Sequence, residues 1–450
     1  MSCHSLQAFT PLSREEYQRL VKAVEEYSKL PDESDEPWED AVPYEPEPYW
    51  QWNKDKKHYH VEDYPVGIEA TAYHGQHGYF IEFIIHLDRL LFGADSHQLP
   101  TPDELSKVRE QFAWYLFLNG WLNEVLQLPS WEQDLNQEKR LNILRQFYDR
   151  LLVQRIDPAV NIPDLSIEAI TLYSRVLNSG RWNNEKRQHF NTIEKPDKPN
   201  PKTFVNSCAL EARVKGRDGK MVTSVRINCY NKEAALLDKM NNPKAKHKPT
   251  KKQIANAKGI YRLEVQVWQA YIETLRDRHH INSRAIADVL NPEFSRMILL
   301  YFIHQFAGDG DYYRLDTAQR KIRASKKKIP SKAMRDKLCT FLQLLHDTYI
   351  SNEDMLPLNE ALAVVAKQMG VTAETIDNYR KQLLELNINP VTLPNDSSMK
   401  CLRNPLHYVL EALPQSAEQG EAMTSESPAE LNGESRSYGI TDDDDSLLPF

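Results

Sequence analysis

Three short strings of the chain combine a tyrosine, carboxylates and cations with apolar residues typical of strands. They are Arg155–Asp157, Arg226–Glu233 and Arg262–Glu264. Alternate residues of a strand share one face. Asp157 is therefore expected on the same face as Arg155, and Glu264 on the same face as Arg262. If these strands belong to one sheet, the sequence predicts a surface that carries Tyr230, two carboxylates and several cations.

This set of side chains suits the transfer of a phosphodiester. A tyrosine phenol is a nucleophile that can hold a phosphoryl group covalently. The carboxylates of Asp157 and Glu264 are ligands that Mg²⁺ or Mn²⁺ prefers, and such a cation would neutralise charge developing on the phosphate. Lys232 or Arg262 would stabilise the same charge and lower the pKa of Tyr230. The residues alone leave a structural alternative open, in which the tyrosine packs and the charges form cross-strand ion pairs.

The elements that must position these residues alternate between strands and helices. We predict an α+β fold whose core is a ferredoxin-like split β-α-β-β-α-β unit with flanking helices. An Asp-Gly turn at Asp218-Gly219 joins its two middle strands. The six core elements are strand Arg155–Ile162, helix Ser166–Leu177, strands Thr203–Val214 and Met221–Tyr230, helix Lys232–Met240 and strand Ile260–Trp268.

The strings and their order resemble the rolling-circle replication initiators of phages and plasmids, in particular the filamentous-phage gene II type. A more distant resemblance is to the initiators and relaxases called Rep_trans. The matching segments are Arg89–Gly93, Arg155–Asn161, Tyr230–Leu236 and Arg262–Val265. The resemblance implies an enzyme that nicks and rejoins one DNA strand at an origin through a covalent 5′-phosphotyrosine. It also implies single- and double-stranded origin DNA, a host helicase and a host polymerase as partners.

The resemblance assigns roles to six residues. They are Tyr230 as nucleophile, Lys232 and Arg262 as phosphate partners, and Asp157, Glu264 and Glu233 as ligands of Mg²⁺ or Mn²⁺. The chain departs from the family pattern at Pro158, which follows the aspartate. Because proline cannot donate a ladder hydrogen bond, this strand is expected at a sheet edge or bulged at Pro158.

Other residues offer alternatives for the same chemistry. Related initiators use a pair of histidines around an apolar residue to bind metal, and His58-Tyr59-His60 has that outline. Ordinary surface histidines are the alternative. The runner-up nucleophile is Tyr271, with Tyr312 and Tyr313 as further choices.

The C-terminal part of the chain has the spacing of a helix-turn-helix. Small, turn and branched residues stand at Ala366, Gly370 and Ile376, and the second helix would run over Ala373–Leu386. A plain pair of packed helices would also use a glycine turn. The predicted DNA-binding residues are Thr372, Thr375, Asn378 and Lys381 on this helix and Lys326, Lys327 and Lys328 in a basic stretch upstream. If this region carries the whole function, the chain is instead a non-enzymatic repressor or partition factor.

The formal net charge of -8 conceals a basic body. Residues 1–50 hold 12 acidic and 4 basic residues, residues 411–450 hold 10 and 1, and the 360 residues between them therefore carry a net charge of +9. A basic body suits a partner made of phosphates. We divide the chain into an acidic N-terminal helix and connector (1–62), a catalytic nicking domain (63–270), a basic helical region (271–345), a helix-turn-helix region (346–410) and an acidic disordered tail (411–450).

Several classes of protein are excluded by composition. No apolar run approaches the ~20 residues that a membrane span requires, and the N-terminus has no secretory signal pattern. The five cysteines are scattered and form no CxxC, which indicates reduced thiols in a cytoplasmic protein. The chain also lacks the glycine-rich strings of P-loop and dinucleotide folds.

Overall fold

The computed structural model describes most of the chain. The described residues are 2–27, 50–54, 56–75, 78–128, 137–179, 190–192, 207–215, 221–243, 245, 247–279, 283–350 and 358–411. The predicted turn at Asp218-Gly219 and the predicted acidic tail after Glu411 lie outside them.

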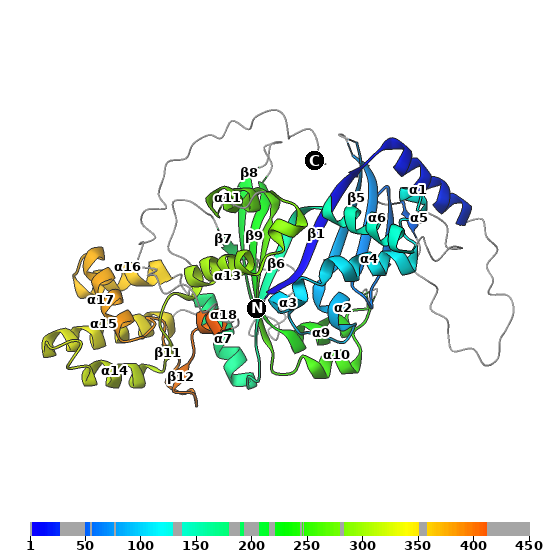
Figure 1. The fold of residues 1–450 in the computed structure, drawn as a ribbon. Coiled ribbons are helices and arrows are strands. Elements are labelled where there is room, and N and C mark those ends of the chain that lie inside the picture. The colour runs from blue at the N-terminus through cyan, green and yellow to red at the C-terminus, as the bar shows by residue number, and fades with distance from the viewer. Residues whose placement is uncertain are drawn as a thin grey trace.

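A ten-stranded antiparallel sheet forms the body of the fold, which is therefore α+β (Figure 1). The strand order is β2-β3-β4-β5-β1-β6-β10-β9-β8-β7. The strands are β1 (Ser2–Leu12), β2 (Gln51–Asn53), β3 (His58–Asp63), β4 (Ile68–Gly75), β5 (Gly78–His86), β6 (Leu152–Ile162), β7 (Phe190–Thr192), β8 (Ser207–Lys215), β9 (Met221–Asn231) and β10 (Tyr261–Trp268).

Helices separate and cover these strands. The helices up to the end of the sheet are α1 (Arg14–Tyr27), α2 (Leu87–Phe92), α3 (Pro102–Leu105), α4 (Val108–Asn119), α5 (Asn123–Leu126), α6 (Gln137–Asp149), α7 (Ile167–Ser179), α9 (Lys232–Asn241) and α10 (Lys251–Asn256). Those that follow it are α11 (Gln269–His279), α12 (Ile286–Val289), α13 (Pro292–Ala307), α14 (Leu315–Ala324), α15 (Lys332–Ile350), α16 (Leu358–Met369), α17 (Ala373–Glu385) and α18 (Pro405–Glu411). The last strand pair is β11 (Tyr312–Tyr313) with β12 (Cys401–Leu402).

The sheet consists of two halves with the same connectivity. Each half has a strand, a helix, a short strand and three strands that meander back to the first. The elements are β1, α1, β2, β3, β4 and β5 in one half and β6, α7, β7, β8, β9 and β10 in the other, where α9 and α10 stand between the last two strands. The halves meet where β1 pairs antiparallel with β6. The topology is therefore two-fold about this pair, although the sequence shows no internal repeat.

One face of the sheet is apolar and forms the core with the helices. Phe83 of β5 contacts Phe112 of α4 and Phe147 of α6 edge to face, with ring centroids 5.3 and 5.9 Å apart. In the second half, Tyr261 of β10 stacks on Tyr173 of α7 at 5.6 Å. Because side chains alternate along a strand, the neighbouring positions form the opposite face. We call it the polar face for its charged residues, although it also carries the buried rings of Phe9 and Phe80, 6.1 Å apart.

The ferredoxin-like core predicted from the sequence does not form. The predicted order of elements along the chain is present, with β7 added. However, β6 pairs with β10, β10 with β9 and β9 with β8, all antiparallel. It follows that β6 and β8 run in opposite directions, whereas a βαβ unit needs parallel strands. Periodicity predicts strands, but it does not determine which strands pair.

The predicted boundary between residues 62 and 63 is also wrong, because it cuts β3. Residues 1–62 were expected to lie outside the catalytic domain, but β1 is at the centre of the sheet and β2 and β3 are at one edge. The expected helix in this region is present as α1, where the hydroxyl of Ser13 accepts a hydrogen bond from the Glu16 amide. A strand on each side was missed.

The C-terminal helices pack as a second unit beside the sheet. In this unit α14 packs on α15, and both α16 and α17 pack on α15 (Figure 1). Glu168 of α7 ties the unit to the sheet domain, because its carboxylate accepts hydrogen bonds from the hydroxyls of Ser397 and Ser398. Across the described residues, no helix has the length and apolar character needed to cross a membrane.

Candidate functional site

The polar face of the sheet gathers charged groups where the start of β1 meets the end of β5. Residues that pair directly across antiparallel strands share a face. Ser5 pairs with both His86 and Asp157, and Arg262 pairs with Tyr230. The register therefore brings five strands of the two halves to one site, and three of its members are residues predicted from the sequence.

Tyr230 lies beside a carboxylate and a guanidinium. Its hydroxyl donates a hydrogen bond to Oε2 of Glu264 over 3.4 Å. Burial and the charge of Glu264 raise the pKa of Tyr230, while Arg262 acts in the opposite direction. The phenol is therefore protonated at neutral pH, and its nearest proton acceptor is the carboxylate of Glu264.

Arg262 is completely buried, and one nitrogen of its guanidinium has no hydrogen-bond partner in the described structure. Its Nε donates to Oδ1 of Asn161 over 2.8 Å, and its Nη2 donates to the carbonyl oxygen of His97 over 3.0 Å. These two bonds fix the plane of the guanidinium. Its Nη1 has no hydrogen-bond partner among the described residues. A buried cation held in this way offers its remaining N–H groups to an anion.

Lys232 begins helix α9 directly after the tyrosine strand. The side chain of Asn231 caps this helix by accepting from the amide of Ala234 over 3.3 Å. The ammonium of Lys232 lies 5.9 Å from the ring centre of Tyr230. Burial, followed by the charge of Arg262, lowers the pKa of Lys232 to about 7. The two cations repel each other, so the site favours a ligand that adds negative charge between them.

Asp157 is held by protein groups. Its carboxylate accepts a hydrogen bond from the hydroxyl of Ser5. It also forms an ion pair with Arg155, whose Nε lies 3.0 Å from Oδ1 of Asp157. Burial raises the pKa of Asp157 to about 6, and the nearby charge of Glu264 acts in the same direction. The third predicted ligand, Glu233, is half-buried in the first turn of α9. Within the described part of the chain, these three carboxylates do not form a cluster close enough to share an ion.

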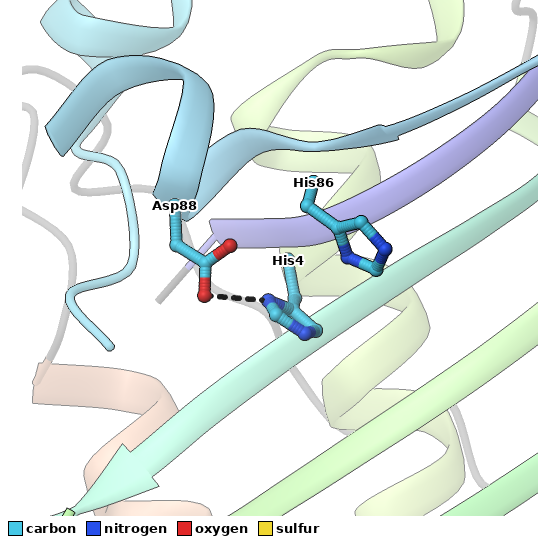
Figure 2. Close-up of side chains that lie close together, drawn as sticks. All are labelled: His4, His86 and Asp88. Atoms are coloured by element: carbon cyan, nitrogen blue, oxygen red, sulfur yellow. Dashed lines mark ion pairs between the residues drawn. The ribbon is translucent and has the colours of Figure 1, made fainter. Parts of the chain in front are cut away.

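A different set of side chains has the spacing of a metal centre. His4, His86 and Asp88 offer ligand atoms that all lie within 4.8 Å of one another (Figure 2). Nδ1 of His4 is 3.3 Å from Oδ2 of Asp88. Burial lowers the pKa of both histidines, that of His86 to about 3, so the imidazoles are neutral as metal ligands must be. Two imidazoles with one carboxylate suit Mn²⁺ better than Mg²⁺, which prefers oxygen ligands alone.

A β-bulge places His4 in this cluster. Cys3 pairs with Pro158 but Ser5 pairs with Asp157, so β1 has one extra residue, which is His4. In a regular strand His4 and Ser5 would point to opposite faces, and a bulge re-aims the extra side chain. Pro158 favours the bulge because it has no N–H for the ladder. The strand of Pro158 was expected at an edge or bulged at this residue; instead β6 is central, and the extra residue lies opposite, in β1.

The tyrosine group and the histidine group act as one electrostatic cluster. The carboxylate of Asp88 raises the pKa of Tyr230 and acts to raise that of Lys232. In return, His4, Arg262 and Lys232 hold the pKa of Asp88 far below its usual value although burial opposes them. Sequence analysis missed these two residues because His86 ends an apolar strand and Asp88 lies in the first turn of the helix α2 that follows it. A histidine and an aspartate two residues apart after the apolar run Tyr79–Ile85 were the available signal.

The alternative residues predicted from the sequence lie in other surroundings. His60 contacts the hydroxyl of Thr71 at 3.2 Å, and neither His58 nor His60 belongs to the metal-type cluster. Tyr271 packs on Phe302 with ring centroids 5.4 Å apart. The hydroxyl of Tyr312 donates to the carbonyl of Ala307, and that of Tyr313 accepts from Lys321.

The two C-terminal helices predicted from the sequence are present as α16 and α17, while their identity as a DNA-binding helix-turn-helix stays a prediction. Thr372 caps α17 by accepting from the amide of Thr375 over 3.3 Å, and Gly370 makes the turn with a φ of 60°. Asn378 and Lys381 are exposed, as is Thr372, while Thr375 is half-buried. Upstream, Lys326, Lys327 and Lys328 are exposed, but Nζ of Lys328 donates to the carbonyl of Glu385 over 2.6 Å and so caps the end of α17.

Gly67 leaves the space that His86 occupies. It has a φ of +77°, and a Cβ added to it would lie 2.8 Å from Cβ of His86 and 2.9 Å from Cδ of Arg89. We expect Gly67→Ala to displace the imidazole of His86 and to destabilise the fold by about 1–3 kcal/mol. Urea denaturation measures the second effect and Mn²⁺ titration the first. Gly78→Ala is the matched control, because its added Cβ meets nothing within 4 Å although its φ is also positive. Equal Mn²⁺ affinity in both variants would contradict this role.

Comparison of the chain with family models, with curated proteins and with solved structures finds no match.

Proposed function

We propose that the chain initiates rolling-circle replication by nicking and rejoining one DNA strand at an origin. The observation that carries the proposal is the site around Tyr230. There a tyrosine hydroxyl, a carboxylate that accepts its hydrogen bond and a buried arginine with an unpaired Nη1 lie together. Beside them is a cluster able to hold a divalent cation. These are the groups that transesterification of a phosphodiester requires. The net positive charge of the residues between the two acidic ends suits DNA as the substrate.

The proposed reaction exchanges one ester for another. The phenol oxygen of Tyr230 attacks the scissile phosphorus, and its proton passes to the carboxylate of Glu264. The bond from phosphorus to the 3′ oxygen breaks, that oxygen takes up a proton, and a 5′-phosphotyrosine remains on the protein. The free 3′-OH can then prime a host polymerase. Attack of a 3′-OH on the phosphotyrosine reverses these changes and rejoins the strand.

The surrounding cations act on the phosphate. Arg262 offers its free Nη1 and Lys232 its ammonium to the oxygens that gain charge in the transition state. A cation held by His4, His86 and Asp88 would supply Lewis-acid stabilisation of the same charge. Under this proposal Glu264 serves as the proton acceptor. Asp157 has a structural role, because its bonds to Ser5 and Arg155 hold β1 and β6 together at the centre of the sheet.

The C-terminal helices are proposed to hold duplex DNA beside the nicking site. Lys326→Ala and Lys327→Ala are each expected to weaken binding to duplexes of any sequence and to lower the slope of log affinity against log salt by about 1. Fluorescence anisotropy across a salt series measures this. Lys328→Ala is the control, because its loss of the bond to Glu385 should lower thermal stability rather than the salt slope. Unchanged slopes in the first two variants would remove this surface from the proposal.

A nicking assay tests the function directly. The protein is incubated with Mn²⁺ and the supercoiled DNA of its replicon, and the product is examined for a nicked circle that carries protein. The expected result is a covalent adduct at the 5′ end of the nick. Sequence-specific duplex binding without any adduct would instead identify a non-enzymatic DNA-binding protein.

A further inference from the structure

Five aromatic rings form a continuous row at the β2 edge of the sheet, far from the nicking site. We call this row the aromatic strip; its members are Trp52, Tyr59, Tyr17, Tyr79 and His74. The neighbouring ring centroids are 4.8 Å apart for Trp52 and Tyr59, 6.1 Å for Tyr59 and Tyr17, 4.7 Å for Tyr17 and Tyr79, and 4.5 Å for Tyr79 and His74. The last two pairs are stacked nearly parallel, with interplanar angles of 29° and 19°.

The strip is open to solvent at both ends. Trp52 is 46 % exposed and His74 is exposed, while the three tyrosines between them are half-buried. No other aromatic side chain among the described residues is in the set of exposed large hydrophobic residues. Packing alone would favour burying the terminal rings, because exposing the indole of Trp52 forgoes hydrophobic stabilisation.

A lysine-bearing turn borders the strip at Trp52. Lys54, Lys56 and Lys57 lie in the hairpin between β2 and β3, and all three are exposed. The side chain of Asn53 accepts from the amide of Lys56 over 3.1 Å, and Lys57 has a φ of 54°. An acidic group also acts on the strip, because burial and then the charge of Glu25 of α1 raise the pKa of Tyr59.

We propose that the aromatic strip and the lysine turn form a second binding site for single-stranded DNA. Bases stack on exposed rings whatever their sequence, and a basic border attracts the phosphates. The charge asymmetry sets the orientation, with the phosphates toward Lys54, Lys56 and Lys57 and away from Glu25. The choice of DNA as ligand rests on the proposed function. The site gives a role to Tyr59, the central residue of the string His58-Tyr59-His60, whose histidines do not belong to the metal-type cluster of the described structure.

The position of the strip defines what it would hold. Tyr79 is the second residue of β5 and His86 is the last, so about 24 Å of strand separates the strip from the metal-type cluster. The two sites also lie on opposite faces, since Tyr79 and His86 differ by an odd number of positions. The strip would therefore bind nucleotides distant from the scissile phosphate and contribute to affinity without taking part in the chemistry.

Binding of labelled oligo-dT to the full chain tests the site. We expect Trp52→Ala to weaken the complex with a 30-mer about tenfold and Trp52→Phe to restore most of the affinity. A charge reversal at Lys54 and Lys56 should weaken it further and reduce the salt dependence. Leu118→Ala, at a residue 66 % exposed elsewhere, is the control and should bind as wild type does. In the nicking assay Trp52→Ala should raise KM with kcat unchanged.

The outcomes separate this site from the proposed function. If wild type forms the covalent adduct but Trp52→Ala binds the 30-mer as tightly as wild type, the strip is not a DNA site and the nicking function stands. If wild type forms no adduct but binds oligo-dT in a Trp52-dependent way, the nicking function is wrong and the strip is supported. Equal losses on single-stranded and duplex DNA would overturn stacking, because paired bases do not expose their faces. A strip that binds no DNA and associates with protein would overturn the proposal as well.

Discussion

Replacing Tyr230 by phenylalanine is expected to abolish the covalent adduct and to slow nicking by at least about a thousandfold. Tyrosine and phenylalanine share the ring, so the contacts of the β9 end with β10 remain. What disappears is the oxygen that would attack phosphorus and its hydrogen bond to Glu264. The measurement is transfer of radiolabel from a nicked oligonucleotide to the protein, with the peptide mapped by mass spectrometry.

Two further variants make the result specific. Tyr271→Phe should retain wild-type labelling, because Tyr271 packs on Phe302 and its side chain is buried. Glu264→Gln should form the same adduct more slowly, since the amide preserves the shape of the side chain but accepts no proton. A label mapped to Tyr271, Tyr312 or Tyr313 would refute the assignment of Tyr230 and keep the class of enzyme. Full activity of Tyr230→Phe with no label at all would refute the mechanism.

The strands that carry the candidate site were predictable because local patterns determine them. Alternating residues predict β6, β9 and β10, and the same alternation correctly places Tyr230 on one face with Arg262. The pairing of strands was not predictable, since it depends on contacts between segments far apart in the chain. Ser5 and Asp157, separated by about 150 positions, become neighbours only through the topology.

The metal-type cluster also depends on strand pairing, which the sequence alone does not predict. His4 was overlooked because β1 was not predicted, and its orientation depends on a bulge that only the pairing with Pro158 creates. Asp157 and Glu264 looked like ligands because carboxylates in strands suit Mg²⁺. In the structure each has a protein partner, Ser5 and Arg155 for Asp157 and Tyr230 and Gln266 for Glu264. The residue type indicates which ligands a side chain can bind. Whether it is available to bind them depends on the hydrogen bonds and ion pairs that it already makes within the protein.

Removing one ligand of the metal-type cluster is expected to abolish metal binding and nicking together. His86→Ala deletes one of three donors, and Asp88→Asn keeps the shape of the side chain while removing its charge. We expect each to weaken Mn²⁺ binding at least about 100-fold, since even changes outside the ligand set cost 10–100-fold. Mn²⁺ electron paramagnetic resonance measures the affinity. The thermal stabilisation that a bound ion gives wild type should be absent from both variants.

Variants of the two carboxylates predicted from the sequence show which residues bind the metal, when their Mn²⁺ affinities are compared with those of the cluster variants. If His4, His86 and Asp88 hold the ion, Asp157→Asn and Glu264→Gln should bind Mn²⁺ within a few-fold of wild type, because neither residue belongs to the cluster. His58→Ala, at a half-buried histidine outside the cluster, should also bind normally. The opposite pattern, with affinity lost in Asp157→Asn and Glu264→Gln and kept in His86→Ala, would return the metal to the carboxylates. It would then leave the two imidazoles as neutral groups that only pack around Asp88, and the preference for Mn²⁺ over Mg²⁺ should vanish with them.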